Sequence, residues 1–190
     1  MEKLFGKKIE YIDRVGCHPR LAYFQPVMDK NKILFVDGKY SSSKHNHRVS
    51  TRIIDKKRGQ ALISVELSRW SGYGFFGNGT SEAKYFCGIE RGHWFSHRVA
   101  SYVDTIDEAI KWLKPAEVQN AKIVKRQGDF YFVKQKKGNG NMKALLGTRH
   151  KAKKTEDGWE ISHPQHRTLK LEGHTWKAVR QKQIGNGDVD

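Results

Sequence analysis

The stretch Arg48–Trp70 (RVSTRIIDKKRGQALISVELSRW) decides the expected fold. Its first part, Arg48–Ile54, is rich in β-branched residues, and its last part, Gln60–Trp70, mixes apolar and polar residues as a strand does. Between them, Asp55–Gly59 (DKKRG) has the charge and the glycine of a tight turn. We therefore predict that the two parts form an antiparallel hairpin.

Segments with strand-like composition, rich in β-branched and aromatic residues, lie on both sides of this hairpin. In the first half of the chain they are Lys8–Arg14, Lys32–Val36, Ala83–Ile89 and His93–Val103. In the last third they are Lys122–Arg126, Asp129–Lys134, Gly158–Ser162, Thr168–Glu172 and Thr175–Arg180. Most of the chain is therefore expected to be β-sheet.

A short helical element is expected in the middle of the chain. Thr105 and Glu108 have the spacing of a capping box, in which each side chain binds a backbone N–H at the helix start. Pro115 ends this helix and can begin a second short one. The apolar residues at helical spacing are Ile106, Ala109, Ile110 and Leu113.

These elements predict an α+β fold, mainly antiparallel β, with the helical element between two basic β-rich units. A length of 190 residues suits one domain or two small ones. We expect an N-terminal unit at Met1–Val103, a helical brace at Asp104–Ala121, a C-terminal unit at Lys122–Ile184 and a frayed tail at Gly185–Asp190.

Positive charge is the strongest compositional signal, with 36 Lys and Arg against 20 Asp and Glu and a formal net charge of +16. Met1–Gln60 holds 14 basic and 6 acidic residues, Ala61–Ala121 holds 6 and 7, and Lys122–Lys182 holds 16 and 5. Generic soluble surfaces usually mix both signs, and membrane-surface binding needs a basic amphipathic helix that the sequence lacks. We expect a polyanion to lie across the two basic flanks, with the helix facing away.

Nucleic acid, with RNA favoured over DNA, is the expected polyanion. Basic clusters lie at predicted turns and strand ends, where long side chains reach phosphates. Tyr131 and Phe132 lie beside one cluster, and Trp159 and Trp176 lie near another, although such aromatics also fill β cores. The expected phosphate contacts are Lys56, Lys57, Arg58, Lys134, Lys136, Lys137, Arg149, Lys151, Lys153 and Lys154.

The glycine-rich stretch Ser71–Ser81 (SGYGFFGNGTS) matches neither a P-loop nor a dinucleotide fingerprint. Tyr73 and Phe75 among its glycines predict a stacking platform for unpaired bases. The alternative is that this loop folds back and its aromatics join the core.

Histidines in the last third leave open whether the chain is an enzyme. A histidine pair beside cations can cleave RNA without metal, with one as base and one as acid. His150 and His166, supported by Arg149 and Arg167, are the candidate catalytic residues for such a ribonuclease or phosphodiesterase. The alternative is that these histidines contact phosphate or solvent only.

We expect no metal site and no cofactor. Residue types that bind metals occur at Cys17-His18, His45–His47, Cys87 and His163–His166, but neither cysteine has the paired spacing of a structural zinc site. His45 and His47 could chelate an ion from one face of a strand, although a solvated polar loop at Ser41–His47 is the expected account. The N-terminus has no apolar secretory segment, so both thiols are expected to be reduced in the cytoplasm.

Three short motifs resemble an uncharacterised family of prokaryotic and phage-associated proteins. They are Arg126–Val133 (RQGDFYFV), Gly147–His150 (GTRH) and His163–His166 (HPQH), the last followed by Leu169 and Leu171. The resemblance covers roughly the last 70 residues and carries no activity. It implies a prokaryotic or mobile-element origin and a shared β-rich unit.

Together these observations predict a nucleic-acid-binding protein that can join protein partners in a nucleoprotein complex. Two alternatives stay open: a metal-independent nuclease, and a basic module that docks on an acidic protein.

Overall fold

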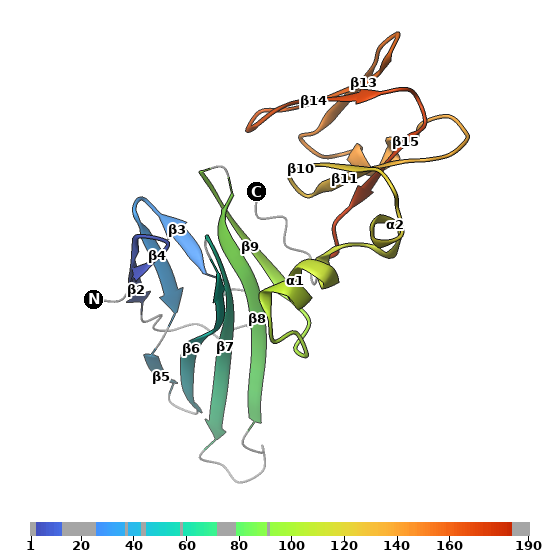
Figure 1. Ribbon diagram of the computed structural model, residues 1–190. Helices are drawn as coiled ribbons and strands as arrows, with labels where there is room; N and C mark the ends of the chain where they lie inside the picture. The colour runs from blue at the N-terminus through green and yellow to red at the C-terminus, as the bar shows by residue number, and fades with distance from the viewer. Residues whose placement is uncertain are drawn as a thin grey trace. The chain divides into compact units, whose positions relative to one another are not determined.

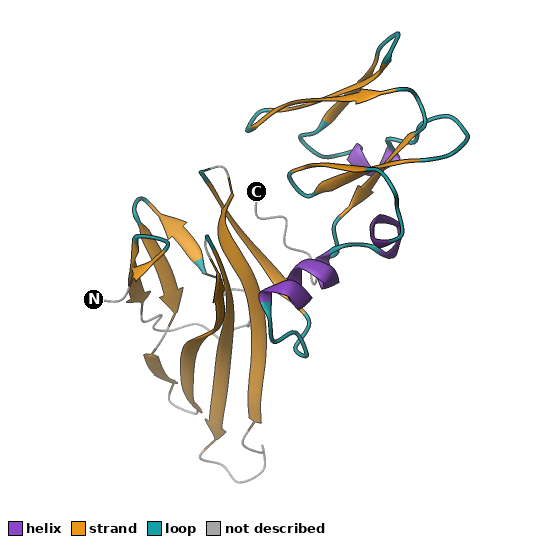
Figure 2. Cartoon of the chain, viewed as in Figure 1, coloured by secondary structure: helices purple, strands orange, loops and turns teal. Residues whose placement is uncertain are grey.

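The computed structural model describes residues 3–12, 26–36, 38–42, 45–57, 59–71, 79–90 and 92–183. The chain forms two compact units, unit 1 (Met1–Trp112 with Gln183–Asp190) and unit 2 (Leu113–Lys182) (Figure 1). Both consist mostly of antiparallel β-sheet with short helices (Figure 2). Within the described residues, no helix is long and apolar enough to cross a membrane.

Unit 1 contains two sheets. The larger is antiparallel and has the order β5 (Gly38–Ser42), β6 (His45–Lys57), β7 (Gln60–Ser71), β8 (Gly79–Glu90), β9 (His93–Val99). The smaller has the order β1 (Lys3–Leu4), β2 (Lys7–Ile12), β4 (Lys32–Val36), β3 (Val27–Asp29), with β2 and β4 parallel. The predicted hairpin at Arg48–Trp70 is confirmed, since β6 and β7 pair from His45↔Ser71 to Lys57↔Gln60.

The two sheets of unit 1 share one apolar core. Leu4, Ile33 and Phe35 of the smaller sheet pack with Ala61, Ile63 and Cys87 of the larger one. Cys87 is a free thiol in this core, and burial raises its pKa. The middle of β7 is buried on both of its faces, which explains the nearly continuous apolar run there.

Helix α1 (Ile106–Leu113) begins at the predicted capping box. The N–H of Glu108 donates to Thr105 Oγ1 at 3.2 Å, and the N–H of Thr105 donates to Glu108 Oε2 at 3.1 Å. The backbone N–H groups of Asp104 and Thr105 both donate to the Glu108 carboxylate and hold its pKa below its ordinary value. The Ile106 N–H donates to Asp55 Oδ2 at 2.9 Å, so strand β6 supplies a second cap.

The start of α1 is fixed to the larger sheet of unit 1 by ion pairs. Lys84 on β8 is nearly buried and binds Asp104 at 2.6 Å, and Lys57 on β6 binds Asp107 at 2.5 Å. The second helix, α2 (Ala116–Gln119), begins after Pro115 as predicted. The two helices belong to different units, whereas the sequence grouped them in one brace at Asp104–Ala121.

Unit 2 consists of two three-stranded antiparallel sheets and a short 3₁₀ helix, η2 (Lys143–Leu145). One sheet has the order β10 (Val124–Gln127), β11 (Phe130–Lys134), β15 (Trp176–Arg180), and the other β12 (Lys151–Lys154), β13 (Gly158–His163), β14 (His166–Glu172). The sheets share a core of Phe130, Phe132, Leu145, Ile161, Leu171, Trp176 and Ala178.

The five strands predicted in the last third overlap β10, β11, β13, β14 and β15. Strand β12 was not expected, because its sequence Lys-Ala-Lys-Lys has low strand propensity. Its pairing with β13 and the half-buried Ala152 on the core hold it in the sheet. Strands β1, β3 and β5 were also missed, because β1 and β3 have only two and three residues and β5 (GKYSS) consists mostly of glycine and polar residues.

Replacing the helix cap tests the attachment of α1. Thr105→Ala removes the acceptor for the Glu108 N–H, so unit 1 should lose about 1 kcal/mol of unfolding free energy. Urea denaturation followed by circular dichroism measures this loss. Thr105→Ser keeps the hydroxyl and should stay within about 0.5 kcal/mol of wild type. Equal destabilisation by both changes would contradict the capping role.

Candidate functional site

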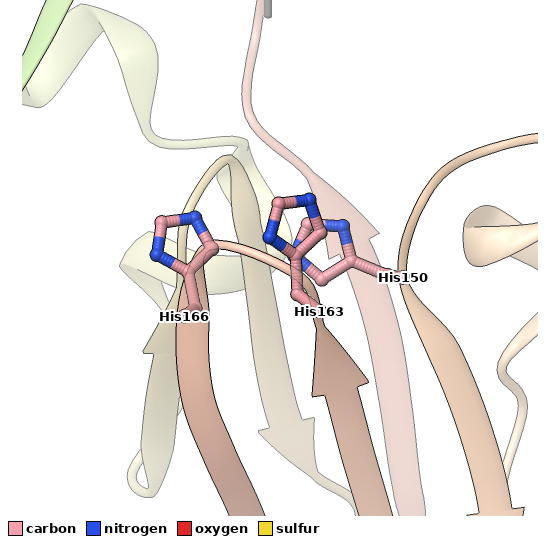
Figure 3. Close-up of side chains that lie close together, drawn as sticks. All are labelled: His150, His163 and His166. Atoms are coloured by element: carbon pink, nitrogen blue, oxygen red, sulfur yellow. The ribbon is translucent and has the colours of Figure 1, made fainter.

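Three histidines of unit 2 converge at one end of the sheet β12-β13-β14. One imidazole nitrogen from each of His150, His163 and His166 lies within 4.8 Å of the other two. The ring centroids are 4.3 Å apart for His150 and His163, 4.6 Å for His163 and His166, and 6.1 Å for His150 and His166. Figure 3 shows the three rings side by side. We call this group the histidine cluster.

The β13–β14 hairpin brings His163 and His166 together. Only Pro164 and Gln165 separate the two strands, and His163 pairs directly with His166. The register shifts between this pair and the next, Ile161↔Leu169, so β14 has one residue more than β13 in this interval. Without this bulge, His166 and Leu169 would point to opposite faces, since side chains alternate along a strand.

His150 joins the cluster from the neighbouring strand. It lies two residues before Ala152, which pairs with Ile161, so alternation places His150 on the same face as that core residue. Its backbone N–H donates to Thr148 Oγ1 at 3.2 Å. Its ring packs edge-on against Phe130 at 4.7 Å between centroids, and only 8% of the residue is exposed.

Gly128 closes the cluster from the turn between β10 and β11. Its φ of +55° is a conformation that glycine adopts without strain. A Cβ at this position would lie 2.8 Å from His166 Nε2 and 3.5 Å from His150 Nε2. The ring of His166 therefore packs so closely on Gly128 that a side chain at this position would displace it.

The buried Gln127 ties this turn to the hairpin. Its Nε2 donates to the carbonyl of Arg167 at 2.7 Å and to that of Ile161 at 3.3 Å. Both carbonyls flank the register shift, so Gln127 holds the bulge that orients His166. Neither Gln127 nor Gly128 was expected at a site, although both lie in the RQGD motif, which meets the GTRH and HPQH motifs here.

The proposed catalytic histidines, His150 and His166, do lie in one cluster, with Arg149 and Arg167 exposed beside them in the sequence. The ring of His163 lies between them, however, closer to each than they are to one another. A phosphate held between an acid and a base would need the place that His163 occupies.

The predicted phosphate-binding lysines fall in both units. In unit 1, Lys57 is in the ion pair with Asp107, and Lys56 Nζ lies 3.4 Å from the carbonyl of Lys3. Arg58, Tyr73 and Phe75 lie outside the described residues. The expected cations of unit 2 are all exposed: Lys134, Lys136, Lys137, Arg149, Lys151, Lys153 and Lys154.

Most aromatics near the basic clusters of unit 2 are core residues. Tyr131, Phe132 and Trp176 are at most 6% exposed, which favours the alternative that these aromatics fill the β core. Trp159 differs, because it is half-buried and lines an open pocket of about 530 Å³. The other residues lining this pocket are Met142, Lys143, Leu145, Leu146, Gly147, Thr148, His150, Lys151 and Ala152.

No metal site was expected from the sequence, yet the three histidines lie close enough together to hold a metal ion. The decisive feature is the HPQH motif, whose two-residue connection makes its histidines a cross-strand pair. The position of His150 next to these two histidines could not be predicted, because strand β12, which follows His150, was not predicted.

Two glycine substitutions test the packing at the cluster. Gly128→Ala should destabilise unit 2 by more than the about 1–2 kcal/mol that a positive φ costs, because the new Cβ meets His166 Nε2. Gly147→Ala is the matched control, since its φ is +76° and nothing lies within 4 Å of a Cβ there. Urea denaturation gives both values, and imidazole NMR spectra should change only in Gly128→Ala. Equal losses and unchanged spectra would contradict the close approach.

No family model, curated protein or solved structure matches this chain. Its function is therefore inferred from its own side chains, distances and charges.

Proposed function

We propose that this chain binds nucleic acid through unit 2, with single-stranded RNA favoured over DNA. In this proposal the chain is an α+β protein, and the helical stretch Asp104–Ala121 is not part of the binding surface. The observation that carries the proposal is the surplus of exposed cations on unit 2, where Lys122–Lys182 has 16 basic and 5 acidic residues. Such a surplus costs self-repulsion in the free protein and favours a dense polyanion.

The outer face of the sheet β12-β13-β14 supports this assignment. The pairings Lys151↔Ser162, Lys153↔Glu160 and Glu160↔Lys170 put these five side chains on the face opposite the core residue Ile161. With Glu172, which pairs with Gly158 on the same face, the outer face has three lysines and two carboxylates. The Lys170–Glu160 ion pair is long, at 3.6 Å, and Lys170 is 78% exposed, so solvent weakens it.

Further cations extend this surface along the chain. Lys136 and Lys137 lie exposed beyond the end of β11, and Arg149 and Arg167 precede and follow the histidines of the cluster. Arginine and lysine side chains in such positions contact phosphate without reading sequence. The expected binding is therefore strongly dependent on salt and weakly dependent on sequence.

The pocket beside η2 favours an unpaired strand. The Trp159 indole is held by a hydrogen bond from Nε1 to the carbonyl of His174 at 3.3 Å, and it packs against the apolar core. Leu146, at 78% exposure, forms an apolar wall, and Lys143 and Lys151 bring positive charge to the same pocket. An aromatic ring with nearby cations suits a stacked base and its phosphate.

Removing two lysines from the sheet face tests the electrostatic proposal. Lys151→Gln/Lys153→Gln should weaken binding of a 20-nucleotide single-stranded RNA about 10-fold near 0.1 M salt. It should also lower the slope of log K against log salt by about 1.4, which is about 0.7 for each phosphate that the variant no longer neutralises. Fluorescence anisotropy over a salt series measures both quantities.

The matched control removes two charges from the brace. Lys111→Gln/Lys114→Gln should bind within about 2-fold of wild type with the same salt slope. Equal weakening by both double variants would mean that net charge alone governs binding. The absence of any salt-dependent binding, together with no nucleic acid copurifying by the 260/280 nm absorbance ratio, would contradict the proposal and favour an acidic protein partner.

The role of Trp159 has its own test. Trp159→Leu should weaken single-stranded RNA binding about 5- to 100-fold, the range for losing one stacked base, and should change duplex binding little. Trp159→Phe keeps an aromatic ring and should recover most of the affinity. Competition between a single strand and its duplex, measured for each variant, gives the comparison. A loss that is equal for single strand and duplex would exclude base stacking on Trp159.

A further inference from the structure

We propose that His150, His163 and His166 form a binding site for one divalent transition-metal ion of the zinc type. Three imidazole nitrogens within 4.8 Å of one another are the observation that carries this inference. The site does not depend on nucleic-acid binding, so either proposal can fail without the other.

Gly128 permits the close approach of two of the three rings to the turn between β10 and β11. The point where a Cβ would stand is 2.8 Å from His166 Nε2 and 3.5 Å from His150 Nε2, so a larger residue would press on the ring of His166. The spacing of the three imidazole nitrogens, within 4.8 Å of one another, is what fits one ion. In a tetrahedral site with metal–nitrogen distances of about 2.0–2.1 Å, ligand nitrogens lie about 3.3 Å apart. Small rotations of the three side chains are enough to bring their nitrogens from the present separations to this distance.

The framework that carries the three ligands is rigid. His163 and His166 are a cross-strand pair at the end of a hairpin, and His150 packs on the core residue Phe130. Gln127 fixes the adjoining bulge through two hydrogen bonds to backbone carbonyls. Ligands on paired strands with supporting hydrogen bonds lose little freedom when they bind a metal.

The ligand type selects the class of ion. Imidazole nitrogen suits Zn²⁺, Co²⁺, Ni²⁺ and Cu²⁺, whereas Mg²⁺ and Ca²⁺ require oxygen ligands. Among the described residues, the cluster contains neither a carboxylate nor a thiol at ligand distance. The bound ion would therefore keep its full charge of +2.

Three protein ligands leave one tetrahedral position for water or an anion, as in open zinc sites. Solvent has access from the side of the half-buried His166. The Arg126 side chain lies at the same turn, because its Nε donates to the Gly128 carbonyl at 2.9 Å. The retained charge of the ion and this guanidinium both favour an anionic fourth ligand.

One existing contact must be given up when the metal binds. The N–H of Gln165 donates to His163 Nδ1 at 3.2 Å. Coordination through Nδ1 uses that lone pair, and coordination through Nε2 requires a proton on Nδ1. Since Gln165 is in an exposed turn, water can take over its N–H.

The direct test uses the untagged full chain after EDTA treatment and desalting. Isothermal titration with Zn²⁺ should show one site per chain with micromolar or tighter affinity, and Mg²⁺ should show none. Titration with Co²⁺ should produce visible absorption bands of tetrahedral intensity. His163→Gln and His166→Gln should each weaken Zn²⁺ affinity about 100-fold or more and abolish those bands.

The controls separate this site from casual histidine binding. His174→Gln, in the same unit, and the double variant His45→Gln/His47→Gln should keep the single tight site. Circular dichroism and urea denaturation of the metal-free variants verify that each is folded, and Gly128→Ala provides an independent variant that keeps all three histidines but should bind Zn²⁺ more weakly. The proposal is overturned if wild type binds no Zn²⁺, or if folded His163→Gln and His166→Gln bind it as wild type does.

Discussion

The register of the β13–β14 hairpin is the constraint on which the rest of unit 2 depends. Ile161 and Leu171 must face the shared core, and that requirement fixes which side chains of both strands point inward. A slip by one residue would turn every side chain of a strand to the other face. The single bulge between Ile161 and His163 then brings His166 back to the inner face, where it meets His163 and His150. The histidine cluster is thus a consequence of core packing together with one local irregularity.

The same alternation separates two chemistries on one thin sheet. The inner face of β12-β13-β14 packs Ile161 and Leu171 into the core and ends in imidazoles, while the outer face has Lys151, Lys153 and Lys170. A unit of 70 residues needs its large aromatics inside to offset chain entropy, and Tyr131, Phe132 and Trp176 are accordingly buried. Trp159, at the edge of this core, is left to line the pocket.

In unit 1, some of the basic residues have structural roles, so the number of charges does not identify the binding residues. Lys57 and Lys84 belong to a basic chain, yet both are paired with carboxylates that hold the start of α1 on the larger sheet. Asp55 serves the same junction by accepting the N–H of Ile106. The Thr105–Glu108 capping box could be identified in the sequence because its two members are three residues apart. The Asp55 contact could not, because 51 positions separate its partners.

Elements with local signals could be predicted from residue order alone. The β6–β7 hairpin, the capped helix α1, the break at Pro115 and five strands of unit 2 follow from residue type and spacing within about a dozen positions, a range over which backbone preferences and turns act. Features that depend on long-range packing could be seen only in the folded chain. Lys151–Lys154 form a strand despite their low strand propensity, because they pair with β13. Three aromatic residues that were considered for ligand stacking are buried in the core. His150 lies beside His163 and His166. Those outcomes depend on which face of a strand is buried in the shared core, and that is determined by packing partners that are distant in the sequence.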